Sequence, residues 1–252
     1  MKGTAVRETA AVNRDLTPEF RSDVTVELVK ASAADSDVVW AARVSTLGEQ
    51  SIEALHQEAE RSAGLIRYLM RARHGSAFEH TSFTFLVKAP IFVFREFMRH
   101  RTFSYNEESA RYRELAPVFY VPGPDRDLVQ EGKPGHYRFL SGTPEQHDLV
   151  SRATKEACCA AYAAYREMLA AGVAREVARG VLPVATYSSM YATCNARALM
   201  SFLSLRTRHE DARYPSYPQR EIEMVAGQME EHFARRMPIT HDAFTAAGRV
   251  SP

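Results

Sequence analysis

The chain has 252 residues, a formal net charge of +1, 45% apolar and 25% charged residues. A charge near zero argues against a polybasic nucleic-acid binder, and no apolar run approaches the length of a membrane span. The charged N-terminus lacks the apolar region of a signal peptide and the three cysteines form no CxxC pair. We therefore expect a cytoplasmic protein without a disulfide scaffold or a structural zinc site.

The first half of the chain is predicted to begin with a flexible leader, residues 1–22. Alternating apolar and polar residues, or stretches rich in β-forming residues, predict two strands, and apolar residues at helical spacing predict two helices between them. Asp35 or Ser36 can cap the first of these helices. In chain order, the four elements cover residues 23–31, 35–44, 58–74 and 80–88.

The second half is predicted to be mainly helical. Pro90 favours a helix start, Thr143-Pro144-Glu145 is a helix-start signature, and Pro218 begins the last helix. The predicted helices cover residues 91–101, 143–171, 174–182, 195–206 and 218–236, with an irregular segment at 114–142 and an extended one at 185–194.

The order of these elements is mixed, which favours an α+β fold over a doubly wound sheet. We expect a mainly antiparallel sheet flanked by long helices, in a single domain at residues 23–236 followed by a C-terminal tail at 237–252. No GxG occurs, so the dinucleotide fingerprint and the P-loop are both absent.

The densest polar cluster follows the helix predicted at 91–101. Arg99-His100-Arg101 ends that apolar helix, and Ser109 and Arg111 follow within a short polar stretch. The cations can simply be a solvated helix end, since the helix dipole tolerates positive charge there. Alternatively, they supply guanidinium groups that bind phosphate, beside amide and carboxylate groups that bind a base or ring edge.

A second cluster lies on the helix predicted at 195–206. Asn195 can cap it, Arg197 lies in its first turn and Arg206 at its end. The two arginines point to opposite sides, about 13 Å apart along the axis, so they either serve two ligands or two subunits, or are ordinary surface residues. Cys194 precedes the cap, where a thiolate would be stabilised, although covalent catalysis is not favoured.

Two further groups of polar residues have ordinary structural explanations. Glu176 and Arg179 are spaced i, i+3 and can pair with each other. His74, Glu79 and His80 fit no common zinc-ligand spacing, so we predict no metal site.

The chain resembles the flavin-dependent thymidylate synthases, the ThyX family. Arg99-His100-Arg101, seven residues and Ser109 form the RHR-x7-S signature of that family. Blocks at 41–45, 78–93, 106–112, 175–183 and 195–206 match the family in its order, and the resemblance covers roughly residues 24–235.

The resemblance implies an enzyme that makes dTMP from dUMP. Methylenetetrahydrofolate would donate the carbon, and NADPH would donate electrons through bound FAD. It also implies an α+β homotetramer whose active sites are built by several subunits, without an enzymic cysteine nucleophile. Carried over by position, the FAD contacts are Ser45, His80, Ser82, Arg99, His100, Arg101, Glu107, Asn195, Ala196, Arg197 and Ser201.

The same resemblance implies a set of dUMP contacts. These are Glu96, Phe97, Met98, Arg99, Glu107, Glu108, Ser109, Ala110, Arg111, Arg179 and Arg206. Arg206 is the implied catalytic residue, because it falls where the family favours ionisation at uracil N3. Neither a nucleic acid nor a membrane is an implied partner.

Three departures from the family pattern affect single contacts. Glu96 stands where some members have Gln, and Ser201 where some have Asn. The segment 207–220 is longer than a common version with a His-Ala-Gln turn, and His209 is the candidate to replace that histidine. Two competing hypotheses remain: a flavoprotein that acts on another pyrimidine or only oxidises NADPH, and a nucleotide- or RNA-binding module.

Overall fold

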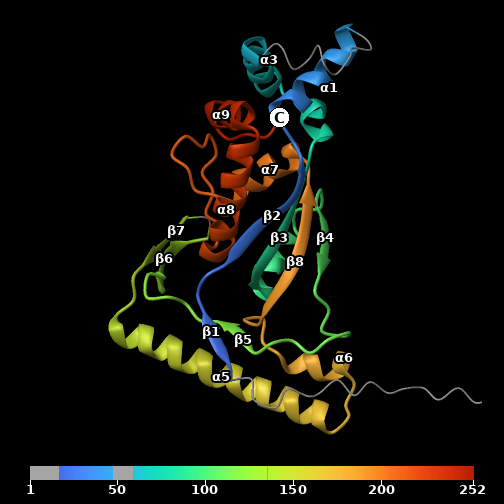
Figure 1. The fold of residues 1–252 in the computed structure, drawn as a ribbon. Helices are drawn as coiled ribbons and strands as arrows, with labels where there is room; N and C mark the ends of the chain where they lie inside the picture. Colours follow the sequence, from blue (N-terminus) through green and yellow to red (C-terminus); the bar gives the residue numbers. More distant parts are fainter. Residues whose placement is uncertain (1–16, 48–58, 135) are drawn as a thin grey trace, which may run out of the picture.

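The main sheet has four antiparallel strands in the order β2-β3-β8-β4 (Figure 1). The computed structural model describes residues 17–47, 59–134 and 136–252. The strands are β2 (Thr25–Ser32), β3 (Ser82–Pro90), β8 (Tyr187–Cys194) and β4 (Ser104–Glu107). The long pairing of β3 with β8 runs from Phe83 opposite Cys194 to Pro90 opposite Tyr187.

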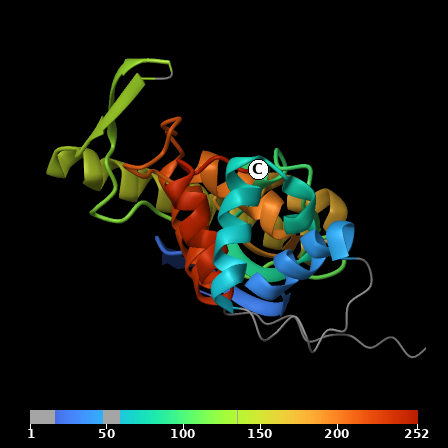
Figure 2. The ribbon, with the colours of Figure 1, turned by 90° about the horizontal axis from the view of Figure 1, so that it is seen from above.

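The main core lies where helices pack on this sheet. Phe83 and Phe85 alternate with the partly buried Thr84 and Leu86 along β3 and are fully buried, and the Phe233 ring of α8 meets Phe83 edge-on. Figure 2 shows α3 and α9 side by side above the sheet. The helices of this part are α1 (Asp35–Leu47), α3 (Ala59–Arg71), α4 (Ile91–Phe97), α7 (Ala196–Arg206), α8 (Arg220–Arg236) and α9 (Pro238–Ala246), with a 3-10 helix η1 (Gly75–His80).

A smaller second core lies at the other end of the molecule, along the long helix α5 (Figure 1). Phe119 packs there with Tyr162 and Tyr165 of α5. Thr143 caps α5 in a capping box with Gln146, as its start signature predicts. The elements of this part are β1 (Glu19–Arg21), β5 (Val118–Tyr120), β6 (Val129–Lys133), β7 (His136–Leu140), α5 (Pro144–Ala170), α6 (Arg175–Ala178) and η2 (Arg179–Val181).

The structure confirms a mixed helix-and-sheet domain with an antiparallel main sheet, but two local predictions are wrong and one strand was missed. The segment 114–142 is not irregular throughout, since β5 pairs with β1 in parallel and β6 with β7 in a hairpin. The helix predicted at 91–101 ends at Phe97, and β4 was not predicted at all.

The two ends of the chain also differ from expectation. Residues 1–16 of the predicted leader lie outside the described residues, while 19–21 form β1. Residues 237–252, predicted as a tail, contain α9, whose Phe244 is fully buried in the main core. Asp35 caps α9 and not its own helix, because its carboxylate accepts from the backbone N–H groups of Ile239 (3.0 Å) and Thr240 (2.9 Å). Within the described residues, no helix has the length and apolar character needed to cross a membrane.

Candidate active site

The helix α7 presents one arginine near each of its ends. The Asn195 side chain caps it by accepting from the backbone N–H of Ala198 (2.8 Å), as predicted. The Ala196 N–H donates to the buried Thr81 hydroxyl (2.9 Å), which ties the helix start to the segment before β3. Buried Phe202 and its apolar neighbours hold the helix in the main core. The sequence between the two arginines therefore fixes their separation along a rigid element.

At the end of α7, the Arg206 guanidinium makes two hydrogen bonds. Its Nη1 donates to Glu96 Oε2 of α4 at 2.7 Å, and its Nε donates to His100 Nε2 at 3.1 Å. Two donors of one planar guanidinium are thus used on two different partners, which fixes the plane of the group.

His100 is held neutral in this arrangement. Burial, and secondly the positive charge of Arg206, lower its pKa to about 4. Since its Nε2 accepts from Arg206, Nδ1 carries the ring hydrogen at neutral pH. The Phe202 ring meets the imidazole edge-on at 4.8 Å. The Tyr105 hydroxyl donates to the carbonyl groups of Phe97 (2.7 Å) and His100 (2.9 Å), and this competition for helix acceptors explains why α4 ends early.

Glu96 has one satisfied and one free oxygen. Its Oε1 is buried and has no hydrogen-bond partner among the residues that the structure describes. Burial raises the pKa of this carboxyl group, although Arg206 opposes the rise. A buried acceptor without a donor is costly, so the atom is suited to receive a donor from a ligand.

At the start of α7, Arg197 has a separate set of partners. Its Nε donates to the Pro252 carbonyl at 2.7 Å, and its Nη1 forms an ion pair with Glu79. Gly75 leaves the necessary room, because a Cβ atom there would lie 2.5 Å from the Arg197 Nε. Arg197 and Arg206 therefore belong to two different polar clusters, as their opposed positions predict.

A cavity of about 310 Å³ brings together several residues that were predicted to bind the substrate. Glu107 begins this run at the end of β4, and burial raises the pKa of its carboxyl group. The lining residues are Ile91, Glu107, Glu108, Ser109, Ala110, Leu115, Arg179, Leu182 and Ser188. Arg111 lies beside this run and pairs with Glu176 at 3.1 Å, so the predicted pairing of Glu176 with Arg179 is wrong.

Other predicted residues are more scattered. Arg99 and Arg101 are exposed, and their side chains have no ion-pair partner in the described part of the chain. Ser45 lies on α1, where its hydroxyl donates to the Ala42 carbonyl (2.9 Å). Exposed Ser82 opens β3, and half-buried Ser201 lies in the middle of α7.

Phe97 and Met98 differ in what they can offer a ligand. The Phe97 side chain is fully buried and stacks on Phe202 with ring centroids 4.9 Å apart, so it cannot itself touch a substrate. Met98 is 53% exposed. His80 is exposed and meets the Trp40 ring edge-on at 6.2 Å.

The cavity lining does not include Arg206, Glu96 or His100. The predicted substrate residues thus fall into two groups, one lining this cavity and one around Arg206. Tyr105 and Ser188 were not predicted as residues of the site, since an isolated tyrosine or serine on a strand carries no local signal of its partners.

Metal and cysteine chemistry find no support in the described residues. No group of three or more His, Cys, Asp or Glu residues in that part of the chain could hold a metal ion. Cys194 is buried, and burial raises the pKa of its thiol well above the usual value, so the helix start beside it does not make it a thiolate.

The relatives found by comparison with known proteins agree on one enzyme family. The family described as "Thymidylate synthase complementing protein" matches residues 27–239. The flavin-dependent thymidylate synthase of Streptomyces avermitilis is 68% identical over 239 residues, covering 94% of this chain and 97% of the relative. That of Streptomyces coelicolor is 68% identical over 235 residues, covering 93% and 96%.

Among solved structures, the chain is similar to a UMP/dUMP methylase, PolB, from Streptomyces cacaoi. The structure bound with 5-Br UMP has 60% sequence identity and a TM-score of 0.86, with 93% of this chain and 99% of that chain covered. The structure bound with 5-Br dUMP has 61% identity and the same TM-score, with 93% and 100% covered.

Proposed function

The chain belongs to the family of flavin-dependent thymidylate synthases, and from this premise we propose that it makes dTMP from dUMP, with methylenetetrahydrofolate as carbon donor and NADPH as reductant. The enzyme class and the need for a flavin follow from the family. The substrate, the donor, the reductant and FAD as the particular flavin are the proposal. The overall reaction balances as dUMP, methylenetetrahydrofolate, NADPH and a proton giving dTMP, tetrahydrofolate and NADP⁺.

The donor groups of this chain suit FAD, whose pyrophosphate is anionic. Arg99 and Arg101 are exposed, and no described carboxylate pairs with them, so both guanidinium groups are available to phosphate oxygens. Arg197 lies in the first turn of α7, where the helix dipole favours an anion. When bound, the flavin supplies the hydride that reduces the transferred carbon to a methyl group. We assign the remaining flavin contacts to Ser45, His80, Ser82, His100, Glu107, Asn195, Ala196 and Ser201.

The two groups of substrate residues offer different chemistry for dUMP. In the cavity, Arg179 and the Ser109 hydroxyl are suited to a phosphate. At the end of α7, the Glu96 Oε1 can accept from a ring N–H, while the Arg206 charge stabilises the negative charge that develops on the uracil. The remaining substrate contacts are the exposed Met98, the backbone of Phe97, and Arg99, Glu107, Glu108, Ala110 and Arg111.

These two groups are separate in one protomer, so we propose that copies of the chain complete one another's sites in a homotetramer. The three cysteines have no part in this mechanism: Cys194 is a buried thiol, and Cys158 and Cys159 lie within α5. Free cysteines agree with a reducing compartment, and we place the enzyme in the cytoplasm.

The observation that carries this proposal is the Arg206 cluster, which joins a fixed positive charge to a buried acceptor without a donor. The first test is the absorbance of the protein after loading with FAD and desalting, with and without dUMP. We expect a retained flavin band that shifts on adding dUMP. A colourless protein would contradict the flavin site.

The second test is tritium release from 5-tritiated dUMP, dependent on methylenetetrahydrofolate. Arg99→Ala and Arg206→Ala should fold but release no tritium, whereas Arg152→Ala, at an exposed residue of α5, should behave as the wild type. Tritium release at the wild-type rate in either folded active-site variant would refute the assigned roles.

A second candidate is methylation of UMP as well as dUMP. The observation that favours it is the 60% identity to a protein described as a UMP/dUMP methylase and solved with 5-Br UMP. Competition between tritiated UMP and dUMP in one reaction measures the preference directly. A preference for dUMP greater than about a hundredfold would exclude UMP as a useful substrate. Such a preference would mean that the site contains a group that rejects the 2′-hydroxyl of UMP.

A further inference from the structure

The last five residues of the chain, Gly248–Pro252, pass close to both ends of α7. We call this stretch the C-terminal strap. It leaves α9 through two consecutive residues with left-handed backbone, Gly248 (φ +73°) and Arg249 (φ +57°). A positive φ is unfavourable for arginine, so it persists only where surrounding contacts enforce it.

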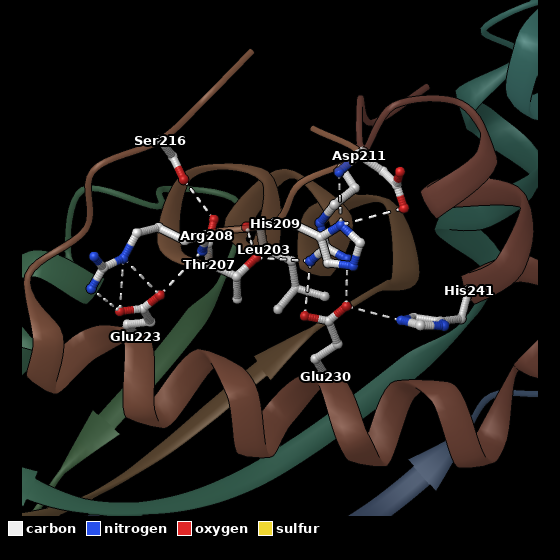
Figure 3. Close-up of polar contacts among 10 residues, drawn as sticks. Leu203, Thr207, Arg208, His209, Asp211, Ser216, Glu223, Glu230 and His241 are labelled. Atoms are coloured by element: carbon white, nitrogen blue, oxygen red, sulfur yellow. Dashed lines mark hydrogen bonds and ion pairs between the residues drawn. The ribbon is translucent and has the colours of Figure 1, made fainter. Parts of the chain in front are cut away.

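Those contacts are made by the Arg249 side chain, which is 1% exposed. Its Nη1 donates to Glu230 Oε1 at 2.6 Å and its Nη2 to Glu230 Oε2 at 2.8 Å, a bidentate ion pair with α8. Its Nη2 also donates to the Thr207 hydroxyl at 2.8 Å. Glu230 additionally contacts His241 of α9 at 2.9 Å, and Figure 3 shows Thr207, Glu230 and His241 around this network.

Thr207 directly follows the implied catalytic residue, Arg206, and is held from three directions. Its hydroxyl donates to the Leu203 carbonyl (2.7 Å) while accepting from Arg249, and its own carbonyl accepts from the Ser216 hydroxyl (Figure 3). A residue fixed in this way fixes the backbone of its neighbour. The residue next to Arg206 is therefore held in place partly by Arg249.

The strap also contacts the other end of the helix. The Pro252 carbonyl accepts from Arg197, and the Ser251 hydroxyl donates to the Arg197 carbonyl at 3.0 Å. At the start of the strap, before these anchors, the Gly248 carbonyl accepts from the Arg213 N–H at 2.9 Å, which joins the strap to the segment after α7. The strap is thus part of the site's framework.

We propose that Arg249 is a positioning residue for Arg206: by bridging Glu230 and Thr207 it sets the direction of the Arg206 guanidinium. The role rests on the proposed function, in which Arg206 stabilises negative charge on the substrate. The Arg249 side chain is 1% exposed and bonded to Glu230 and Thr207, so its effect on the reaction passes through Thr207 and Arg206.

The test compares Thr207→Val and Arg249→Gln with Arg152→Gln, whose arginine is exposed on α5 and pairs with the exposed Glu156. Thr207→Val keeps the shape of the side chain and leaves the ion pair between Arg249 and Glu230 intact. For each variant we measure the melting temperature, the Kd for FAD, and kcat and KM for dUMP. We also follow the imidazole of His100 by nuclear magnetic resonance as a function of pH, without any ligand.

For Thr207→Val and Arg249→Gln we expect kcat to fall about tenfold or more, with KM for dUMP and Kd for FAD within about twofold of wild type. The pKa of His100 should rise above about 4, because a displaced Arg206 no longer lowers it, while burial, the larger cause, still holds it below the ordinary value. The Arg152→Gln control should match the wild type in every measurement.

Wild-type kcat and an unchanged His100 titration in Thr207→Val would overturn the proposal. So would a fall in kcat that merely follows the loss of folded, flavin-bound protein. If Arg249→Gln does not fold, Thr207→Val decides alone. If the wild-type protein makes no dTMP, the proposed function fails. The His100 titration still decides whether Arg249 sets the direction of the Arg206 guanidinium.

Discussion

Replacing Arg206 by lysine separates the charge of this side chain from its geometry. The wild-type guanidinium donates to Glu96 at 2.7 Å and to His100 at 3.1 Å from two atoms of one plane. A lysine ammonium keeps the charge and can reach Glu96, but it does not offer two donors in those fixed directions. His100 Nε2 is then left as a buried acceptor without a donor.

The expected loss of stability follows from the lost hydrogen bond to His100. An unsatisfied buried acceptor costs about 1–3 kcal/mol, and because Arg206 is 19% exposed we expect the lower half, about 1–2 kcal/mol. For a chain of this size that corresponds to a melting temperature lower by about 2–8 °C. The catalytic effect should be larger, since removal of one fixed electrostatic contact lowers kcat by about 10²–10³.

Two assays on Arg206→Lys check these numbers. Calorimetry gives the melting temperature, and tritium release from 5-tritiated dUMP gives the rate, each compared with Arg152→Lys on the exposed face of α5. A variant that releases tritium within about twofold of the wild-type rate would refute the argument, because charge alone would then suffice.

Three further predictions concern the surroundings of the site. Burial lowers the pKa of His100 to about 4, below its unfolded value, so the free energy of unfolding should fall by on the order of 3 kcal/mol as the pH falls from about 6.5 to 4. In urea titrations, His100→Gln should not show this loss of stability. Glu230→Gln leaves a buried arginine unpaired and should lower stability by about 3–5 kcal/mol, while Glu231→Gln, at an exposed neighbour, should change it by less than about 0.5 kcal/mol; equal effects in denaturant titrations would contradict the buried pair. Gly75→Ala should displace the arginine at the start of α7 and raise the Kd for FAD, whereas Gly64→Ala, with open space on α3, should raise stability by about 0.5–1 kcal/mol; an unchanged Kd in Gly75→Ala would count against that arginine as a flavin contact.

Local signals predicted the parts of the fold that depend on neighbouring residues. The Asn195 cap of α7 and the capping box at the start of α5 each use partners three residues away, and both are present. The β-forming residues at 80–88 predicted a strand there, and β3 covers most of that range.

Features that depend on distant residues were not predictable in the same way. Asp35 is a good cap residue, but its partners lie more than 200 positions away in α9. β1 and β5 are three residues long and exist through pairing with each other, so neither has a periodic pattern to recognise. The same holds for the polar strand β4, which is defined by its pairing with β8.

In the candidate site too, single residues could be predicted but their contacts could not. The resemblance to a family pointed to Arg206, Glu96 and His100 one by one, but their mutual contacts span more than 100 positions and came only from the fold. Arg249 lies beyond the residues that the family matches, and nothing in its sequence context marks it as buried.

The unequal sizes of the two cores have a consequence for hydrogen exchange. The second core holds α5 with few buried side chains, among them Cys158, Tyr162 and Tyr165, whereas the main core joins the four-stranded sheet to several helices. In an isolated protomer, amides of α5 should therefore exchange through partial opening, at a lower free energy than those of β3 and β8. If the proposed homotetramer buries α5 between copies of the chain, this difference should become smaller.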